Sequence, residues 1–160
     1  MDSTWERLFS KKEKSFMADE ILLDSNILVY AYDASEASKN KIAKGLLENC
    51  FNRNRRFFVS IQNLNEFFIT VTKKIERPMD KSEALGRVKN IMDFNGFNVL
   101  VPTSEATITA IHLNISSGSH YWDCFLAATM LENRVFRIYT ENVKDFSRFP
   151  GVLAENPFAV

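Results

Sequence analysis

The sequence is poor in several features that would assign it to a particular class of protein. It holds only two cysteines, Cys50 and Cys124, which by themselves form neither a disulfide framework nor a zinc site. Its apolar runs are only a few residues long, whereas a membrane-spanning helix needs about 18–20. The first nineteen residues are polar and charged, without the apolar stretch of a secretory signal. We therefore expect a cytoplasmic protein with reduced thiols and no membrane association.

The sequence also has no excess of charge of one sign. Its 20 basic and 20 acidic side chains give a net charge of zero, so the basic surplus usual in nucleic-acid-binding proteins is missing. A local acidic pocket beside a local basic rim would give the same total. Any prediction of function must therefore come from where individual charged residues lie.

The length and composition of the chain indicate one compact domain. A chain of 160 residues with 46% hydrophobic content buries roughly 70% of its unfolded surface, which is enough for a core without cross-links. The composition changes once, because residues 1–19 are mainly polar and a regular pattern begins at residue 20. We predict an N-terminal extension over 1–19, either loose or a helix that docks on the body, and a folded domain over 20–160.

Apolar strands alternate with amphipathic helices along this domain. Short apolar runs predict strands at 21–23, 57–59, 97–101 and 135–139, and a further run at 151–153 fits a fifth. Apolar residues at helical spacing predict helices between them, two of which begin at Asp80 and Ser104 and end near Gly96 and Gly118. This alternation favours right-handed crossovers and a mostly parallel sheet of four or five strands. We therefore predict an α/β protein built as an α/β/α sandwich.

Stripes of large apolar residues predict which helix faces pack against the sheet, because each stripe repeats every three or four residues. The residues expected to face the core are Ile61, Leu64, Phe68, Val71 and Ile75 in one helix, Leu85, Val88, Ile91 and Met92 in the next, and Ile108, Ile111 and Ile115 before Gly118. The segment 122–131 is apolar nearly all round, which predicts a buried helix.

Polar residues follow the predicted strands where a functional site is expected, beyond the carboxyl ends of a parallel sheet. Asp24 ends the first strand, where it either belongs to a site or merely caps the next helix. Thr140, Glu141 and Asn142 follow the fourth strand. We expect Asn142 or Glu141 to face the site, and Asp145 either joins them or caps a short helix.

Two further acids lie within predicted helices. Glu66 is turned roughly 160–200° from Leu64 and Phe68 around its helix, on a face that either lines a site or is solvated. Asp123 lies in the first turn of the helix that is apolar nearly all round. Burial of that carboxylate costs several kcal/mol, of which a helix N-terminus offsets only about 0.3–1 kcal/mol. A bound cation would supply the missing stabilisation, so we interpret Asp123 as functional.

The residue types at these positions indicate one kind of chemistry. Converging carboxylates repel one another unless a hard cation such as Mg²⁺ or Mn²⁺ lies among them. Such an ion polarises a phosphoryl oxygen and lowers the pKa of bound water, which is the chemistry of phosphodiester hydrolysis. Competing chemistries lack their residues, because there is no glycine-rich phosphate loop, no serine nucleophile elbow and no obvious partner for His112 or His120.

Four short segments combine these residues in an order typical of one known family. They are ILLDSNIL at 21–28, SIQNLNEF at 60–67, DCFLAAT at 123–129 and YTENVKDF at 139–146. Together they resemble PIN-domain proteins, most closely the VapC-type toxins of toxin–antitoxin pairs. The resemblance implies a PIN-like α/β/α sandwich and an Mg²⁺- or Mn²⁺-dependent endoribonuclease. It also implies a homodimer that an antitoxin peptide silences by lying over the site.

The resemblance assigns roles to individual residues. The principal acids and metal ligands would be Asp24, Glu66 and Asp123. The residues of the accompanying Asn-x-x-Asp-Phe pattern would be Asn142 and Asp145. Ser25 stands where the family often has threonine, and Asn26 would orient the Asp24 carboxylate by a hydrogen bond. The supporting residues would be Ser25, Asn26, Thr140 and Glu141.

We therefore predict a metal-dependent endoribonuclease that cleaves RNA as the toxin of a toxin–antitoxin pair. Lys73, Lys74 and Arg77 are candidates for contacts with RNA phosphates, or simply a solvated helix end. One alternative is a catalytically inactive PIN-like module that binds RNA or protein. Another is a signalling receiver domain, which needs an acid directly after a middle strand, where this chain offers Ser60 or Pro102.

Overall fold

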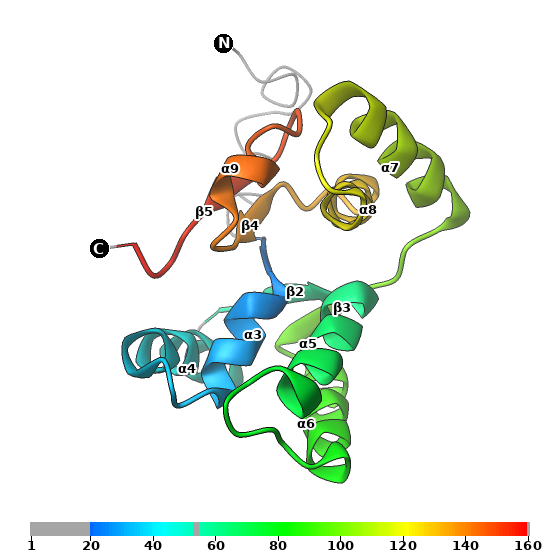
Figure 1. Cartoon of the computed structure of the whole chain (residues 1–160). Helices are drawn as coiled ribbons and strands as arrows, with labels where there is room; N and C mark the ends of the chain where they lie inside the picture. Colours follow the sequence, from blue (N-terminus) through cyan, green and yellow to red (C-terminus); the bar gives the residue numbers. More distant parts are fainter. Residues whose placement is uncertain (1–19, 53–54, 160) are drawn as a thin grey trace.

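The fold is built around a five-stranded parallel sheet (Figure 1). The computed structural model describes residues 20–52 and 55–159. The strands are β1 (Ile21–Leu23), β2 (Phe57–Ser60), β3 (Phe97–Leu100), β4 (Arg137–Tyr139) and β5 (Leu153–Glu155). They lie in the order β3-β2-β1-β4-β5, and each neighbouring pair is parallel. The predicted parallel sheet is confirmed, although its fifth strand begins at Leu153 rather than at Gly151.

Helices cover both faces of this sheet, which confirms the predicted α/β/α sandwich (Figure 1). One layer consists of α3 (Ser25–Tyr32), α4 (Ala37–Phe51), α5 (Ile61–Lys73) and α6 (Lys81–Asp93). The other consists of α7 (Ser104–Ser117), α8 (Tyr121–Glu132) and α9 (Val143–Phe146). Among the described residues, no helix is long and apolar enough to cross a membrane. The predicted extension over 1–19 lies outside the described residues.

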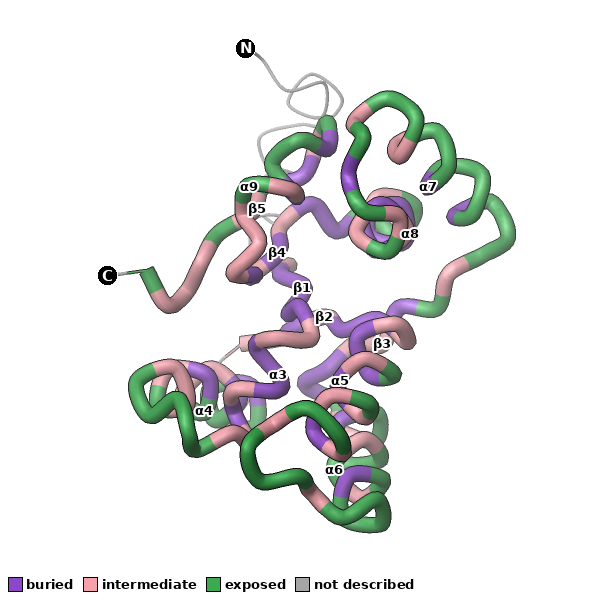
Figure 2. Tube along the Cα trace, in the orientation of Figure 1, coloured by how far each residue is buried: buried purple, intermediate pink, exposed green. Residues whose placement is uncertain are grey.

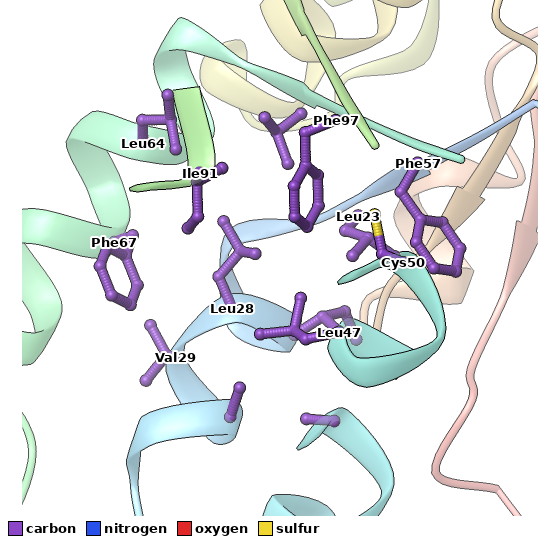
Figure 3. Packing of buried hydrophobic residues seen from close by; sticks show 14 of the residues in the cluster. Leu23, Leu28, Val29, Leu47, Cys50, Phe57, Leu64, Phe67, Ile91 and Phe97 are labelled. Atoms are coloured by element: carbon purple, nitrogen blue, oxygen red, sulfur yellow. The ribbon is translucent and has the colours of Figure 1, made fainter. Parts of the chain in front are cut away.

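Strand β1 lies at the centre of the sheet and is buried on both faces. Ile21 and Leu23 join the apolar cluster under α3–α6, and Leu22 joins the cluster under α7–α9. This division follows from the alternation of side chains along a strand. Figure 2 shows the largely buried β1 and β2 between the two helical layers, and Figure 3 shows the first cluster. The two cysteines are free and buried in these two clusters.

Capping side chains determine where several helices begin. Helix α5 starts directly after β2 because Ser60 Oγ accepts a hydrogen bond from the Asn63 backbone N–H, and Asn63 Oδ1 accepts one from the Ser60 N–H. Asp80 caps α6, as predicted. The predicted cap at Ser104 is wrong by one residue, because Thr103 is the N-cap of α7. The Thr103 backbone N–H and hydroxyl bond to Glu132 of α8, so a tertiary contact fixes this end.

The predicted core faces of α5 and α6 need correction. In α5, Phe67 is fully buried and Phe68 is only partly so. In α6, Ala84 and Ile91 are buried, whereas Leu85 and Met92 are about half exposed, at 50% and 48%. Helix α6 contacts both α5 and β3, and the face that it buries there is narrower than the predicted stripe.

The predicted core face of α7 is wrong. Its isoleucines are exposed, with Ile108 at 52%, Ile111 at 44% and Ile115 at 76%. The buried residues are Ala106 and Ala110, which belong to the same cluster as α8. Helix α8 is largely buried, as predicted, although Trp122 in its first turn is 53% exposed. Small residues on α7 therefore form the contact, and the bulky stripe faces outward.

Candidate active site

Asp24 lies at the end of β1 and is the most buried of the predicted site acids. Its relative exposure is 8%. One carboxylate oxygen accepts a 2.7 Å hydrogen bond from the Ser25 backbone N–H, which caps α3. The other accepts from Thr140 Oγ1 at 2.7 Å and from Asn26 Nδ2 at 3.3 Å. Asp24 is thus both a helix cap and the centre of a buried polar network.

The environment of Asp24 disfavours its charged form. Burial raises the pKa of its carboxyl group to about 6, in spite of the hydrogen bonds from Thr140 and Ser25, which lower it. The negative charges of Glu66 and Asp123 raise this pKa further. The three predicted metal ligands are therefore close enough to repel one another, although they come from three different parts of the chain.

Glu66 lies in the second turn of α5, and its side chain contacts the start of α3. Its Oε2 accepts a 2.8 Å hydrogen bond from Ser25 Oγ, and its Oε1 accepts a 2.9 Å bond from Gln62 Nε2. Gln62 Nε2 also donates to the backbone oxygen of Trp122 at 3.0 Å. The face that was predicted to be either functional or solvated thus contacts the ends of two other elements.

Asp123 is half-buried in the first turn of α8. Its Oδ2 accepts a 3.2 Å hydrogen bond from Asn142 Nδ2. Burial raises the pKa of Asp123, and His120 partly opposes that shift. The charges of Asp145 and Glu66 raise the same pKa. Asp145 therefore also lies within electrostatic range of Asp123.

The segment after β4 supplies the remaining predicted residues. Thr140 is buried, and its hydroxyl accepts a 2.9 Å hydrogen bond from the Asn142 N–H while donating to Asp24. Asn142 is the N-cap of α9, so Asp145 does not cap this helix but lies within it. The Glu141 carboxylate contacts Tyr30 and Lys39 instead of the other acids.

Apart from Glu141 and Asp145, the predicted site residues are joined by hydrogen bonds into one network at the carboxyl edge of the sheet. Within residues 20–52 and 55–159, no group of three or more His, Cys, Asp or Glu side chains has the spacing of a metal site. The donor chemistry nevertheless fits a hard divalent cation, because carboxylates that raise one another's pKa need positive charge. Two buried oxygens beside them, Asn26 Oδ1 and Gln62 Oε1, have no hydrogen-bond partner.

The family model of the PIN domain matches residues 21–152, which is most of the chain. The chain belongs to the PIN domain family. No curated protein matches its sequence.

Solved structures with the same fold as this PIN domain come from several bacteria. VapBC2 from Rickettsia felis, bound to a DNA fragment from its promoter, has a TM-score of 0.61 and 19% identity, covering 86% of this chain and 98% of that chain. A toxin–antitoxin complex from Klebsiella pneumoniae has a TM-score of 0.61 and 21% identity, covering 88% and 99%. The sarcin–ricin loop cleaving toxin VapC20 from Mycobacterium tuberculosis has a TM-score of 0.59 and 14% identity, covering 76% and 89%. At these identities the likeness shows the fold.

The basic residues predicted at the rim of this PIN domain have a mixed environment. Lys73, Lys74 and Arg77 are all exposed. Lys74 lines a groove of about 420 Å³ that reaches Ser25 and Asn26 of the site. The acids that line the same groove are Asp33, Glu36 and Glu76. This groove therefore does not provide the uniformly basic surface that RNA phosphates favour.

Several residues of the network in this PIN domain were not predicted. Gln62 contacts the Trp122 backbone and Asn63 contacts Asp24, and neither contact could be read from the spacing of residues in the sequence. Tyr30 and Lys39 were not singled out at all. Their partner Glu141 lies more than 100 residues away along the chain, so no local pattern indicates the contact.

Proposed function

We propose that this PIN domain is a divalent-metal-dependent endoribonuclease that hydrolyses RNA phosphodiester bonds. The observation that carries the proposal is the buried Asp24, whose pKa of about 6 reflects burial and the charges of Glu66 and Asp123. A bound cation would stabilise the charged form of this buried carboxylate, which its surroundings otherwise disfavour. The similarity of the fold to a toxin described as cleaving the sarcin–ricin loop supports RNA as the substrate.

The proposed mechanism assigns one task to each polar residue. Asp24, Glu66 and Asp123 would hold Mg²⁺ or Mn²⁺, which supplies a Lewis acid for the phosphoryl group and activates water when it is bound. The hydroxyl of Thr140 orients Asp24, and the amide of Asn142 orients Asp123. Gln62 and Ser25 fix the two oxygens of Glu66. Asp145 adds negative charge beside Asp123.

The metal requirement is tested with protein freed of metal by EDTA. Cleavage of a structured RNA should stop in EDTA and return with Mn²⁺ or Mg²⁺. Asp123→Asn should weaken Mn²⁺ binding, measured by calorimetry, at least about 10-fold, because the substitution removes one of the charges that the ion neutralises. Glu105→Gln, at an exposed acid in the first turn of α7, is the matched control and should bind Mn²⁺ like the wild type. Full cleavage in EDTA would refute the proposal.

We further propose that the protein acts as the toxin of a toxin–antitoxin pair and binds an antitoxin protein in the bacterial cytoplasm. The support is the fold, which is similar to toxins solved with their antitoxins from Rickettsia felis and Klebsiella pneumoniae. An antitoxin that covers the carboxyl edge of the sheet would block access of RNA to Asp24 and Asp123.

We also propose that the chain forms a homodimer through α7, whose stripe Ile108, Ile111 and Ile115 is exposed. Ile111→Lys places a charge within this stripe and should convert the dimer to a monomer, because burying an unpaired ammonium costs several kcal/mol. The mass in solution, measured by analytical ultracentrifugation, checks the result. Thr109→Lys adds the same charge to an exposed position outside the stripe and should leave the mass unchanged. A monomeric wild type contradicts the proposal.

A further inference from the structure

Three polar side chains from three separate elements meet beside the active site. Tyr30 comes from α3, Lys39 from α4, and Glu141 from the loop between β4 and α9. Tyr30 Oη donates to Glu141 Oε2 at 2.8 Å, and Lys39 Nζ donates to Tyr30 Oη at 3.1 Å. Lys39 Nζ also lies 2.6 Å from Glu141 Oε1. The three groups therefore form a closed triangle, in which both oxygens of Glu141 have a donor.

The position of Glu141 in the chain connects this triangle to the acids of the site. Glu141 lies between two residues that hold the acids of the site. Thr140 on one side donates to Asp24, and Asn142 on the other side donates to Asp123. The Asn142 N–H also bonds to the Thr140 hydroxyl, so the loop 140–142 is one connected unit. A shift of Glu141 would move both contacts at once.

We propose that Lys39 and Tyr30 are positioning residues that fix the loop 140–142 through Glu141 and thereby set the orientation of Asp24 and Asp123. This inference rests on the proposed function, because the orientation matters only if these acids hold a cation. Tyr30 is itself held in place by two further contacts. Asn40 Nδ2 donates to the Tyr30 backbone oxygen at 2.8 Å, and the rings of Tyr30 and Phe158 meet edge to face at 5.3 Å.

The charge of Lys39 has a second consequence for the site. Its ammonium lies 4.6 Å from the centre of the Tyr30 ring and pairs with the carboxylate of Glu141. Hydrogen bonds to Glu141 and Tyr30 raise the pKa of Lys39, so it stays protonated at neutral pH. Lys39 thus keeps the charge of Glu141 from adding to that of Asp24 and Asp123. Glu141 acts as an anchor for the loop and takes no part as a ligand.

The first test compares Lys39→Met with the wild type. Because Lys39 acts through the loop, we expect kcat for RNA cleavage to fall about 10-fold, with KM for RNA unchanged. Mn²⁺ binding, measured by calorimetry without RNA, should weaken several-fold. Lys39→Arg, which keeps the positive charge, should retain most of the wild-type kcat and Mn²⁺ affinity. Lys41→Met, at an exposed lysine of the same helix, is the matched control and should match the wild type.

The second test asks whether Lys39 acts through Asn142. Asn142→Ala alone should lower kcat about 10-fold, and adding Lys39→Met should lower it no further than about twofold. If the double variant shows the product of the two separate decreases in kcat, the proposal is overturned. A Lys39→Met variant that raises only KM would also overturn it, because Lys39 would then contact RNA. Loss of kcat explained by a smaller folded fraction, measured by circular dichroism, would overturn it too.

The two proposals fail in different ways. A wild type that does not cleave RNA refutes the proposed function, while the calorimetric comparison of Lys39→Met with Lys41→Met still tests the positioning role. An active wild type whose Lys39→Met variant has the same kcat and the same Mn²⁺ affinity refutes only the positioning role. Tyr30→Phe removes both hydrogen bonds of the Tyr30 hydroxyl but keeps the ring and the Lys39–Glu141 ion pair, so it should show a smaller loss in the same direction.

Discussion

Asp24→Asn is expected to lower the rate of RNA cleavage at least about 100-fold at saturating Mn²⁺. Asparagine has nearly the same shape as aspartate but lacks the negative charge that would hold the ion. Asp24 is also the acid on which the fields of Glu66 and Asp123 converge. The measurement is the initial rate at which fragments of a structured RNA form.

Asp93→Asn provides the control for this loss of activity. Asp93 is an exposed acid that ends α6, before β3 begins, and so lies away from the carboxyl edge of the sheet. The same chemical change there should leave the rate within about twofold of the wild type. If Asp24→Asn keeps more than a tenth of the wild-type rate, Asp24 does not hold the catalytic ion.

The same Asp24→Asn substitution is expected to stabilise the fold at neutral pH. The folded-state pKa of Asp24 is about 6, above the ordinary value of 3.8, so the folded protein binds this proton more tightly than the unfolded chain does. The resulting stabilisation is complete below about pH 4 and is lost as the pH rises through 6. At pH 7 the charged form therefore lowers the free energy of unfolding by about 3 kcal/mol relative to acidic pH.

We expect Asp24→Asn to recover about 2 kcal/mol of this loss at pH 7 and almost nothing at pH 4. Part of the hydrogen bonding can adapt, because Asn26 Oδ1 has no partner and can accept from the new amide after the Asn26 side chain turns over. Urea unfolding at several pH values between 4 and 7 measures the difference. A variant less stable than the wild type at pH 7, or a difference independent of pH, would contradict this account.

The two expectations describe one trade-off. The charge of Asp24 lowers the stability of the fold, and its removal is expected to abolish the activity of the protein. This combination is typical of a residue in a functional site. Adding Mn²⁺ should raise the stability of the wild type and should have little effect on Asp24→Asn, because the ion compensates the charge that the variant has lost.

The layout of the site was predictable to different degrees. Asp24 was correctly placed because β1 is a short apolar run with an acid directly after it, and chain order is enough to locate the carboxyl end of a strand. The role of Glu141 was not predictable, since Lys39 and Tyr30 reach it only in the folded chain. The middle strand that a receiver domain requires was also misplaced in the prediction. The prediction placed the second and third strands at the centre, whereas β1 is the middle strand and Asp24 follows it. Membership of the PIN family excludes that alternative instead.

Helix faces were predicted less well than helices. The stripe Ile108, Ile111 and Ile115 has the period of a buried face, but α7 turns Ala106 and Ala110 toward α8. Periodicity measures the separation of apolar and polar residues around a helix and carries no information about which neighbour the helix meets. A bulky stripe fits equally well against a sheet or against another protein chain.

The sequence by itself determined the alternation of strands and helices, the parallel α/β/α fold and the candidate acids at the strand ends, because local spacing and burial of apolar side chains dictate these features. The tertiary structure alone decided which side chains share a contact. Ser25 joins Asp24 to Glu66, Asn142 reaches Asp123, and Lys39 neutralises Glu141. Such contacts depend on the crossing of elements far apart in the chain, at distances where a shift of one ångström makes or breaks a hydrogen bond.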